Sequence, residues 1–252
     1  TLNRENTVLR QMFSHALAQR WVKKQVIVAH VSEAQSKRRR SHFTAQEYRK
    51  LCNRAKTRIY DAIEDGKIRH TENNRKLLFD VIRLLANSGL RVDEMNDMTW
   101  RNIDWERGDI NLNMAGKMRS SRKLILKHAA MDALKSIKER REKWLKQNGK
   151  RQGIDLNERV IALDDGTIVK SMKTAFDALL VACKFQYADI SEKHTLTSLR
   201  HTYATTMLTR KGANRITTEA LAKQMGTSPK MIQAHYGHDT VEDYRDELRG
   251  DD

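Results

Sequence analysis

The chain has 252 residues, enough for one large domain or two smaller ones, and carries 48 Lys and Arg against 32 Asp and Glu, a formal charge of +16. This charge favours nucleic acid as a partner, with general polyanion binding and simple solubility as the alternatives. Two cysteines make no disulfide framework, and no apolar run approaches the ~18 residues of a membrane span. We therefore exclude disulfide-stapled and membrane-spanning classes and expect a cytoplasmic protein.

The first third of the chain predicts helices joined by a basic connector. One Pro and 11 Gly leave few helix breakers, so long helices should dominate. Residues 3–21 carry apolar side chains at helical spacing and predict an amphipathic helix. An aperiodic basic segment follows, which contains Arg38, Arg39 and Arg40. This connector suits a solvated linker and a linker that follows DNA phosphates equally well.

The remaining chain predicts further helices and one β-hairpin. The string Thr44-Ala45-Gln46-Glu47 is a capping box that opens a helix. Alternating apolar residues at 109–114, resumed at 122–126, predict a hairpin with a basic tip. A further strand is possible at 160–163. The predicted helices span about 44–63, 72–88, 128–147, 167–184, 198–211 and 215–225, followed by a short one that begins at Pro229.

Four short strings carry the chemistry. In chain order they are Gly89-Leu90-Arg91, Gly116-Lys117, Leu199-Arg200-His201 and His235-Tyr236. Each string is weak alone, because a single Arg, Lys or Tyr is usually an ordinary surface or core residue. Together and in this order they resemble the active-site boxes of the tyrosine recombinase, or phage integrase, family.

The resemblance implies a fold and a division of the chain. The implied fold is mainly α with a small antiparallel β-sheet, and residues 36–240 would form the catalytic domain. Residues 1–35 resemble the C-terminal part of a helical core-binding domain, and since the chain starts with Thr1 we expect an upstream part to be missing. Residues 241–252 form an acidic tail, which in this family docks on a neighbouring protomer and here equally suits folding back on its own domain.

The resemblance also implies a role for each box. Arg91 and Arg200 would clamp the non-bridging oxygens of a phosphodiester with forked, charge-assisted bonds. Tyr236 would attack the phosphorus, and Lys117 would protonate the leaving 5′ oxygen. The resulting phosphotyrosyl link stores the bond energy, so the reaction requires no ATP, no metal and no other cofactor. The competitors for the general-acid role are Lys123, Arg119 and Arg122.

Two positions depart from the family pattern. The family usually has histidine, or a His or Trp, where this chain has Thr197 and Thr227. A threonine hydroxyl can bind a phosphate oxygen, but it does not shuttle protons near neutral pH. Other imidazoles are available for that work, namely His194, His201, His235 and His238. Glu94 resembles an acidic residue of the family that orients the site, although a plain helix-start carboxylate is an equal alternative. The general base thus stays open.

The function that the resemblance implies is site-specific recombination. The expected partner is double-stranded DNA, and no membrane partner is expected. Integration or excision of a mobile element is the expected context, with a homo-oligomer, a tetramer, on DNA and a monomer without it. Besides the boxes, the expected DNA contacts are Arg38, Arg39, Arg40, Arg119 and Arg122. A DNA-binding module of the same fold without catalysis, and a regulator or other polyanion binder, are the competing hypotheses.

Overall fold

The computed structural model describes residues 2–28, 41–66, 69–112, 122–150, 152–185, 193–209 and 216–236. The chain divides into two compact units, Thr1–Arg38 and Arg39–Asp252. In the first unit, α1 (Leu2–Ala18) confirms the predicted helix apart from its end. The helix stops before Arg20, which adopts a left-handed conformation with φ 59°. Arg10 Nε donates to the Val28 carbonyl at 3.1 Å and ties the following segment to the helix.

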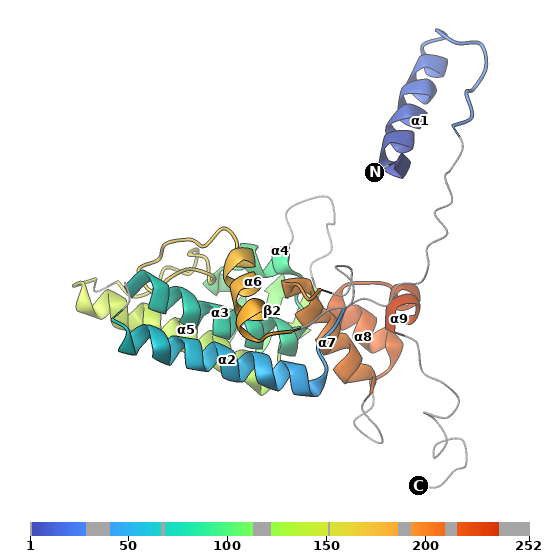
Figure 1. Cartoon of the computed structure of the whole chain (residues 1–252). Coiled ribbons are helices and arrows are strands. Elements are labelled where there is room, and N and C mark those ends of the chain that lie inside the picture. Colours follow the sequence, from blue (N-terminus) through green and yellow to red (C-terminus); the bar gives the residue numbers. More distant parts are fainter. Residues whose placement is uncertain are drawn as a thin grey trace, which may run out of the picture. The chain divides into compact units, whose positions relative to one another are not determined.

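The second unit, described by itself, is mainly helical with a small sheet (Figure 1), which confirms the predicted fold class. Its helices are α2 (Ala45–Glu64), α3 (Arg69–Ser88), α4 (Val92–Asp97), η1 (Trp100–Asn102), α5 (His128–Gln147), α6 (Lys173–Ala182), α7 (Leu196–Leu208), α8 (Thr218–Met225) and α9 (Pro229–Tyr236). The strands described are β1 (Ile103–Asp104), β2 (Asp109–Leu112) and β3 (Arg122–Ile125), which pair antiparallel in the order β1-β2-β3.

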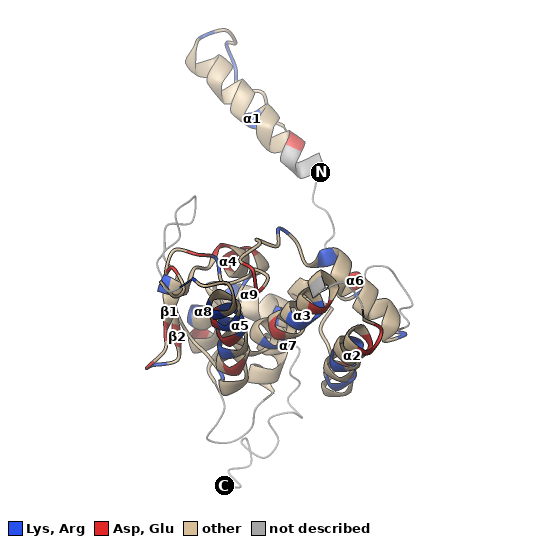
Figure 2. Cartoon of the chain, turned by 90° about the vertical axis from the view of Figure 1, so that its left-hand side faces the viewer, with Lys and Arg blue, Asp and Glu red and all other residues tan. Residues whose placement is uncertain are grey.

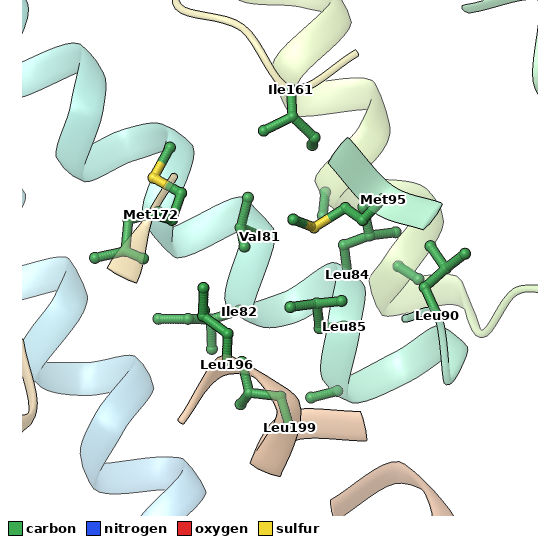
Figure 3. Close-up of a cluster of buried hydrophobic side chains, with 14 of the residues drawn as sticks. Val81, Ile82, Leu84, Leu85, Leu90, Met95, Ile161, Met172, Leu196 and Leu199 are labelled. Carbon is green, nitrogen blue, oxygen red and sulfur yellow. The ribbon is translucent and has the colours of Figure 1, made fainter. Parts of the chain in front are cut away.

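Helix α3 is the centre of the unit and packs against α2, α5 and α7. Figure 3 shows its side chains Ile82 and Leu85 beside Leu196 and Leu199 from the start of α7. Ile82, Leu85 and Leu199 are fully buried, and burial of such a side chain stabilises the fold by about 1.5–3 kcal/mol. The packing therefore holds the N-terminal half of α7 firmly against α3.

Helix α7 is buried on nearly all sides, which explains why its sequence lacks an amphipathic pattern. Its buried residues include the polar side chains Ser198, Arg200, His201 and Thr202. A buried polar group costs free energy unless it has a hydrogen-bond partner. These four side chains must therefore be held by partners from neighbouring elements, and those partners define the interior of the candidate site.

The predicted hairpin is confirmed, with Leu112 opposite Arg122 and Asp109 opposite Ile125. Its tip, with Lys117 and Arg119, lies outside the described residues. So do the connector arginines Arg38, Arg39 and Arg40, the histidine His238 and the tail 241–252. The capping box is confirmed as well, because the Thr44 N–H donates to Glu47 Oε2 at 2.8 Å and the Glu47 N–H donates to Thr44 Oγ1 at 3.2 Å.

Two predicted elements are wrong in part. Residues 160–163 form no strand; Ala162 makes only an isolated bridge with Ile168. The helix predicted from 167 begins at Lys173. Both differences have one cause, a tight turn in which the Leu163 N–H donates to the Thr167 carbonyl at 2.9 Å and Gly166 adopts φ 90°. The turn uses the backbone groups that a strand or an earlier helix start would need.

Charged residues are spread over the second unit. Lys and Arg lie on α2 and α5, with Asp and Glu among them (Figure 2). Among the described residues, no helix combines the length and apolarity needed to cross a bilayer. That part of the chain also holds no group of three or more His, Cys, Asp or Glu side chains arranged to bind a metal ion.

Candidate active site

Three arginines from three elements converge on the C-terminal end of α8. Each donates to one of three successive backbone carbonyls. The pairs are Arg122 Nη1 with the Gln224 carbonyl at 2.5 Å, Arg200 Nη2 with the Met225 carbonyl at 2.7 Å, and Arg91 Nη2 with the Gly226 carbonyl. The last carbonyls of a helix lack intrahelical partners and carry partial negative charge, so they are suitable acceptors for cations. The end of α8 thus gathers guanidinium groups that are far apart in sequence.

Two glycines make this close approach possible. Gly226 ends α8 with φ 61°, and a Cβ there would lie 2.5 Å from Arg122 Nε. Gly89 has φ 72°, and its carbonyl accepts a second hydrogen bond from Arg200, through Nη1. A Cβ at Gly89 would lie 2.7 Å from Cδ1 of Tyr203. Any larger residue would be strained at either place, and it would displace Arg122 at Gly226 or Tyr203 at Gly89.

Glu94 on α4 connects two of the three arginines. Its Oε1 accepts from Arg91 Nη1 at 2.7 Å, and its Oε2 pairs with Arg122 Nη2. The same Oε2 accepts from the Arg91 backbone N–H at 2.9 Å, so Glu94 also caps α4. Its side chain is only 1% exposed. Both roles considered for Glu94, orienting carboxylate and helix-start carboxylate, are therefore present in the geometry.

The cluster carries a surplus of positive charge. Burial and then the charge of Arg91 lower the pKa of Arg200 to about 10, while Glu94 acts in the opposite direction. Burial also lowers the pKa of Arg122, again opposed by Glu94. Both guanidiniums stay protonated near neutral pH. Among the described residues, Glu94 is the carboxylate paired with this cluster, so the arrangement suits an incoming anion.

An open pocket of about 880 Å³ lies beside the cluster. Its lining includes Arg91, Glu94 and Arg122, together with Gly226 and Thr227 after α8. The Arg91 side chain is 35% exposed, whereas Arg200 is 8% exposed. Arg91 is therefore directly accessible from the pocket, and Arg200 is held more deeply by the carbonyls that it binds.

Tyr236 lies at the end of α9 and contacts His201, the residue next to Arg200 on α7. Its hydroxyl is hydrogen-bonded to Nδ1 of His201, and the two rings are 5.6 Å apart between centroids. Its charge is also one of those that act on the pKa of Arg200. Helix α9 starts at Pro229 as predicted, and Ser228 Oγ accepts from the Met231 N–H at 3.3 Å. Helices α7, α8 and α9 contact one another (Figure 1) and so bring Tyr236 near Arg200.

The other auxiliary residues fall in different places. Thr227 lines the pocket, and its N–H donates to the Ala222 carbonyl at 3.0 Å. Thr197 is exposed in the first turn of α7 and is not part of the pocket lining. His235 is partly exposed, with its ring centroid 6.4 Å from that of Tyr236. The structure thus places Thr227 in the pocket lining with Arg91 and Arg122, and His235 beside Tyr236, while Thr197 is not in that lining.

Sequence reasoning missed Gln224, which joins α8 to the sheet. Its Nε2 donates to the carbonyls of Ile125 at 2.8 Å and Ser88 at 3.2 Å. Its Oε1 accepts from the Ile125 N–H at 3.1 Å. The side chain therefore binds the end of β3, and its own carbonyl binds Arg122. A glutamine in an amphipathic helix carries no sequence signal for this role, because such a residue is usually solvated.

A second contact missed by the sequence links the start of the unit to α7. Ser41 Oγ and His194 Nδ1 are 2.5 Å apart, and the Phe43 N–H donates to Thr202 Oγ1 at 2.8 Å. Burial lowers the pKa of His194, and Glu47 acts in the opposite direction. These bonds fasten the segment before α2 to the helix that carries Arg200.

Comparison with known proteins agrees with this geometry. The sequence matches the phage integrase family over residues 43–243. No curated protein sequence matches the chain significantly. Among solved structures, the Tn1549 transposon integrase in complex with transposon right-end DNA is 17% identical, with a TM-score of 0.66 over 99% of this chain and 78% of that one.

Two further structures have the same fold. A lambda integrase dimer bound to a COC′ core site is 19% identical, with a TM-score of 0.64 over 94% of this chain and 74% of that one. XerA recombinase is 18% identical, with a TM-score of 0.56 over 84% of this chain, which spans 65% of the XerA chain. The family match covers most of the sequence, and the structural likeness establishes the fold. The chain therefore belongs to the phage integrase family, and its second unit has the fold of a tyrosine recombinase catalytic domain.

Proposed function

We propose that this chain is a site-specific recombinase that cleaves and rejoins duplex DNA through a 3′-phosphotyrosyl intermediate. The observation that carries the proposal is the convergence of Arg91, Arg200 and Tyr236 around one interior with a surplus of positive charge. A scissile phosphate is an anion, and a surplus of positive charge favours its binding. The family match supports the same reaction class.

The proposed roles follow from the donors. A guanidinium has five N–H groups, and Arg200 uses two nitrogens for the carbonyls of Gly89 and Met225. Further N–H groups of Arg91 and Arg200 would bind the non-bridging oxygens, where negative charge increases in the transition state. The Tyr236 oxygen would form a bond to phosphorus while the bond from phosphorus to the 5′ oxygen breaks. Attack by the 5′ hydroxyl would reverse the step without ATP.

The partners are proposed from what the neighbours bind. The Tn1549 integrase and lambda integrase structures contain DNA, and the lambda integrase is a dimer on its core site. We propose double-stranded DNA as the substrate, a tetramer on it during strand exchange, and integration or excision of a mobile element as the context. The reaction would take place where the DNA is, in the cytoplasm of a bacterial cell.

We also propose roles in DNA binding and assembly for the segments outside the catalytic centre. Residues 1–35 are proposed as the C-terminal part of a core-binding domain, and 241–252 as a tail that docks on a neighbouring protomer. The connector arginines Arg38, Arg39 and Arg40 and the hairpin residue Arg119 would bind DNA phosphates. Such contacts position a protein on DNA without reading the sequence.

A suicide substrate tests the central proposal. In a duplex with a nick close to the cleavage site, the short 5′ fragment diffuses away and the covalent adduct accumulates. We expect the wild-type chain to form an adduct that survives denaturation, and Tyr236→Phe to bind the same DNA without forming it. Tyr60→Phe, at a tyrosine that is 65% exposed on α2, is the control and should behave as wild type. DNA binding without any adduct from the wild-type chain would establish the alternative, a non-catalytic DNA-binding module.

Lys117 is proposed as the general acid. Lys117→Ala should cleave slowly, and a substrate with a bridging 5′ phosphorothioate should restore the rate because its leaving group needs no proton. Lys123→Ala is the matched comparison, since Lys123 lies on β3 and pairs with Asp109 at 2.9 Å. Rescue of Lys123→Ala in place of Lys117→Ala would assign the acid to Lys123.

A further inference from the structure

The hydrogen bond between His201 and Tyr236 addresses how the nucleophile loses its proton. His201 follows Arg200 on α7 and is 6% exposed. Its Nδ1 contacts the Tyr236 hydroxyl, and the rings are inclined by 45°. The contact joins α7 to α9 and involves the oxygen atom that would attack phosphorus. The imidazole is thus already at hydrogen-bonding distance from the proton that must leave.

A phenol needs such help. Its unperturbed pKa is about 10, so only on the order of one molecule in a thousand is ionised at pH 7. Neutral imidazole is a base of suitable strength near neutral pH and accepts a proton through one ring nitrogen. The hydroxyls of Thr197 and Thr227, at the positions where the resemblance led us to expect histidine or tryptophan, are not basic in this range. A proton acceptor must therefore come from elsewhere in the chain.

Other described histidines have less suitable geometry. His235 lies next to Tyr236 on α9, with the ring centroids 6.4 Å apart in an edge-on arrangement. His194 is bonded to Ser41, and its ring lies 3.8 Å between centroids from Phe43. The contact of His201, in contrast, is made by ring nitrogen Nδ1 with the Tyr236 hydroxyl itself.

We infer that His201 is the general base of cleavage and accepts the Tyr236 proton on Nδ1. As the bond from the Tyr236 oxygen to phosphorus forms, the bond from phosphorus to the 5′ oxygen breaks, and the general acid, for which Lys117 is proposed, protonates that oxygen. In rejoining, the 5′ hydroxyl attacks phosphorus and the imidazolium returns its proton to the departing Tyr236 oxygen. This inference rests on the proposed function.

The charges around the pair stabilise the phenolate that proton transfer produces, and the same cations disfavour a lasting imidazolium on His201. Arg200 lies beside His201 on α7, and Arg91 and Arg122 lie close enough to Arg200 to lower its pKa. These cations favour the phenolate over the phenol. His235 on α9 is a further titratable neighbour, with its ring centroid 6.4 Å from that of Tyr236. The cationic cluster therefore stabilises the phenolate that loss of the proton to His201 produces.

The experiment compares His201→Asn and His201→Ala in the full chain with the nicked suicide substrate. Asparagine retains an amide near the position of Nδ1 and keeps a hydrogen bond to Tyr236, but it does not take up a proton. Alanine removes both properties. His70→Asn, at an exposed histidine on α3, is the control. Adduct formation is measured in single turnover across pH, together with DNA affinity.

We expect both His201 variants to form the adduct about 10²-fold more slowly or worse, with unchanged DNA affinity. Their rate should keep rising with pH towards ionisation of the phenol, whereas the wild-type rate should level off at lower pH. A wild-type rate in His201→Asn would overturn the inference, because it would show that a hydrogen bond without proton transfer is enough. Failure of the wild-type chain itself to form an adduct would instead refute the proposed function and the inference together.

A second measurement separates catalysis from a purely structural role. Tyr236 is replaced by a fluorinated tyrosine, whose phenol is more acidic, in the wild-type and His201→Asn chains. If His201 removes the proton, the rate deficit of His201→Asn should shrink towards none, because the phenolate is already present. A deficit of unchanged size with the fluorinated residue would overturn the inference and make His201 a structural residue.

Discussion

Between α3 and α5 arginines meet carboxylates directly, whereas at the end of α8 arginines donate mainly to backbone carbonyls. In the first cluster, Arg140 pairs with Asp80 at 2.8 Å and Asp164 at 3.2 Å, and Arg141 pairs with Glu158 at 3.0 Å. In the second, within the described part of the chain, Glu94 is the carboxylate that pairs with Arg91 and Arg122, while Arg200 binds the carbonyls of Gly89 and Met225.

The two clusters differ in how far the charge of their arginines is balanced by carboxylates. Burial raises the pKa of Asp80 while Arg140 lowers it, so in the paired cluster the attraction between the opposite charges offsets the cost of burying them. At the end of α8 the carbonyls supply partial charges only, and burial, followed by the charge of Arg91, lowers the pKa of Arg200, which Glu94 opposes. Both clusters are arginine-rich, but only the second retains the capacity to bind an added anion. Perturbed, unbalanced charge is typical of functional sites.

Of all the variants, Arg200→Ala should have the largest effect on the cleavage rate relative to its effect on the unfolding free energy. Loss of the clamp should slow adduct formation by on the order of 10²–10³-fold, because donors that meet the transition-state charge are removed. Unfolding free energy should change less than the rate does, since the variant loses a costly buried cation as well as two hydrogen bonds to carbonyls. Single-turnover cleavage and denaturant unfolding measure the two quantities. Near-normal cleavage would contradict the clamp role.

Arg140→Ala should show the reverse pattern. Asp80 is 2% exposed and would lose its 2.8 Å partner, which should lower the unfolding free energy by about 3 kcal/mol. The cleavage rate of the folded protein should stay at the wild-type value because this cluster does not contact the pocket. A matched loss of cleavage in Arg140→Ala, at temperatures where it remains folded, would erase the distinction between the two clusters.

Glu94→Gln should increase the surplus of positive charge at the end of α8, because glutamine has nearly the same shape as glutamate but no charge. The amide loses the charge-assisted bonds to Arg91 and Arg122, which should lower the unfolding free energy by about 2 kcal/mol. Cleavage should slow by about tenfold, corresponding to about 1.4 kcal/mol, because Arg91 is held less firmly. Asp164→Asn is the control in the paired cluster, where Arg140 keeps Asp80. Equal losses of cleavage rate in Glu94→Gln and Asp164→Asn would contradict a specific role of Glu94 in positioning Arg91.

The smallest effect concerns His194, a single buried imidazole beside one carboxylate. Its pKa is lowered in the folded state, so below pH 6.5 the unfolded chain binds the proton more tightly and stability falls as pH falls. Glu47 at 3.8 Å reduces this effect and His42 adds to it. Compared with wild type, His194→Gln should have a flatter dependence of unfolding free energy on pH below 6.5. An identical dependence in the two chains would assign it to other groups.

Local sequence signals predicted most helices because those signals act within a few residues. The capping box at Thr44 and Glu47, the Ser228-Pro229 helix start and the alternation on β2 and β3 are of this kind. The turn at Gly166 was missed because its backbone bonds compete with apolar periodicity. The two-residue strand β1 is too short to show any periodicity.

By itself the sequence determined the order of the boxes, and with it the candidate residues Arg91, Arg200 and Tyr236. Only the tertiary structure decided what each of them touches. The role of Gln224, the pairing of Arg122 with Glu94 and the bond between His201 and Tyr236 connect residues up to 136 positions apart. The physical reason is that a hydrogen bond depends on distances set by helix packing, and the burial of α7 forces its polar side chains to find partners on α8, α9 and the segment before α4.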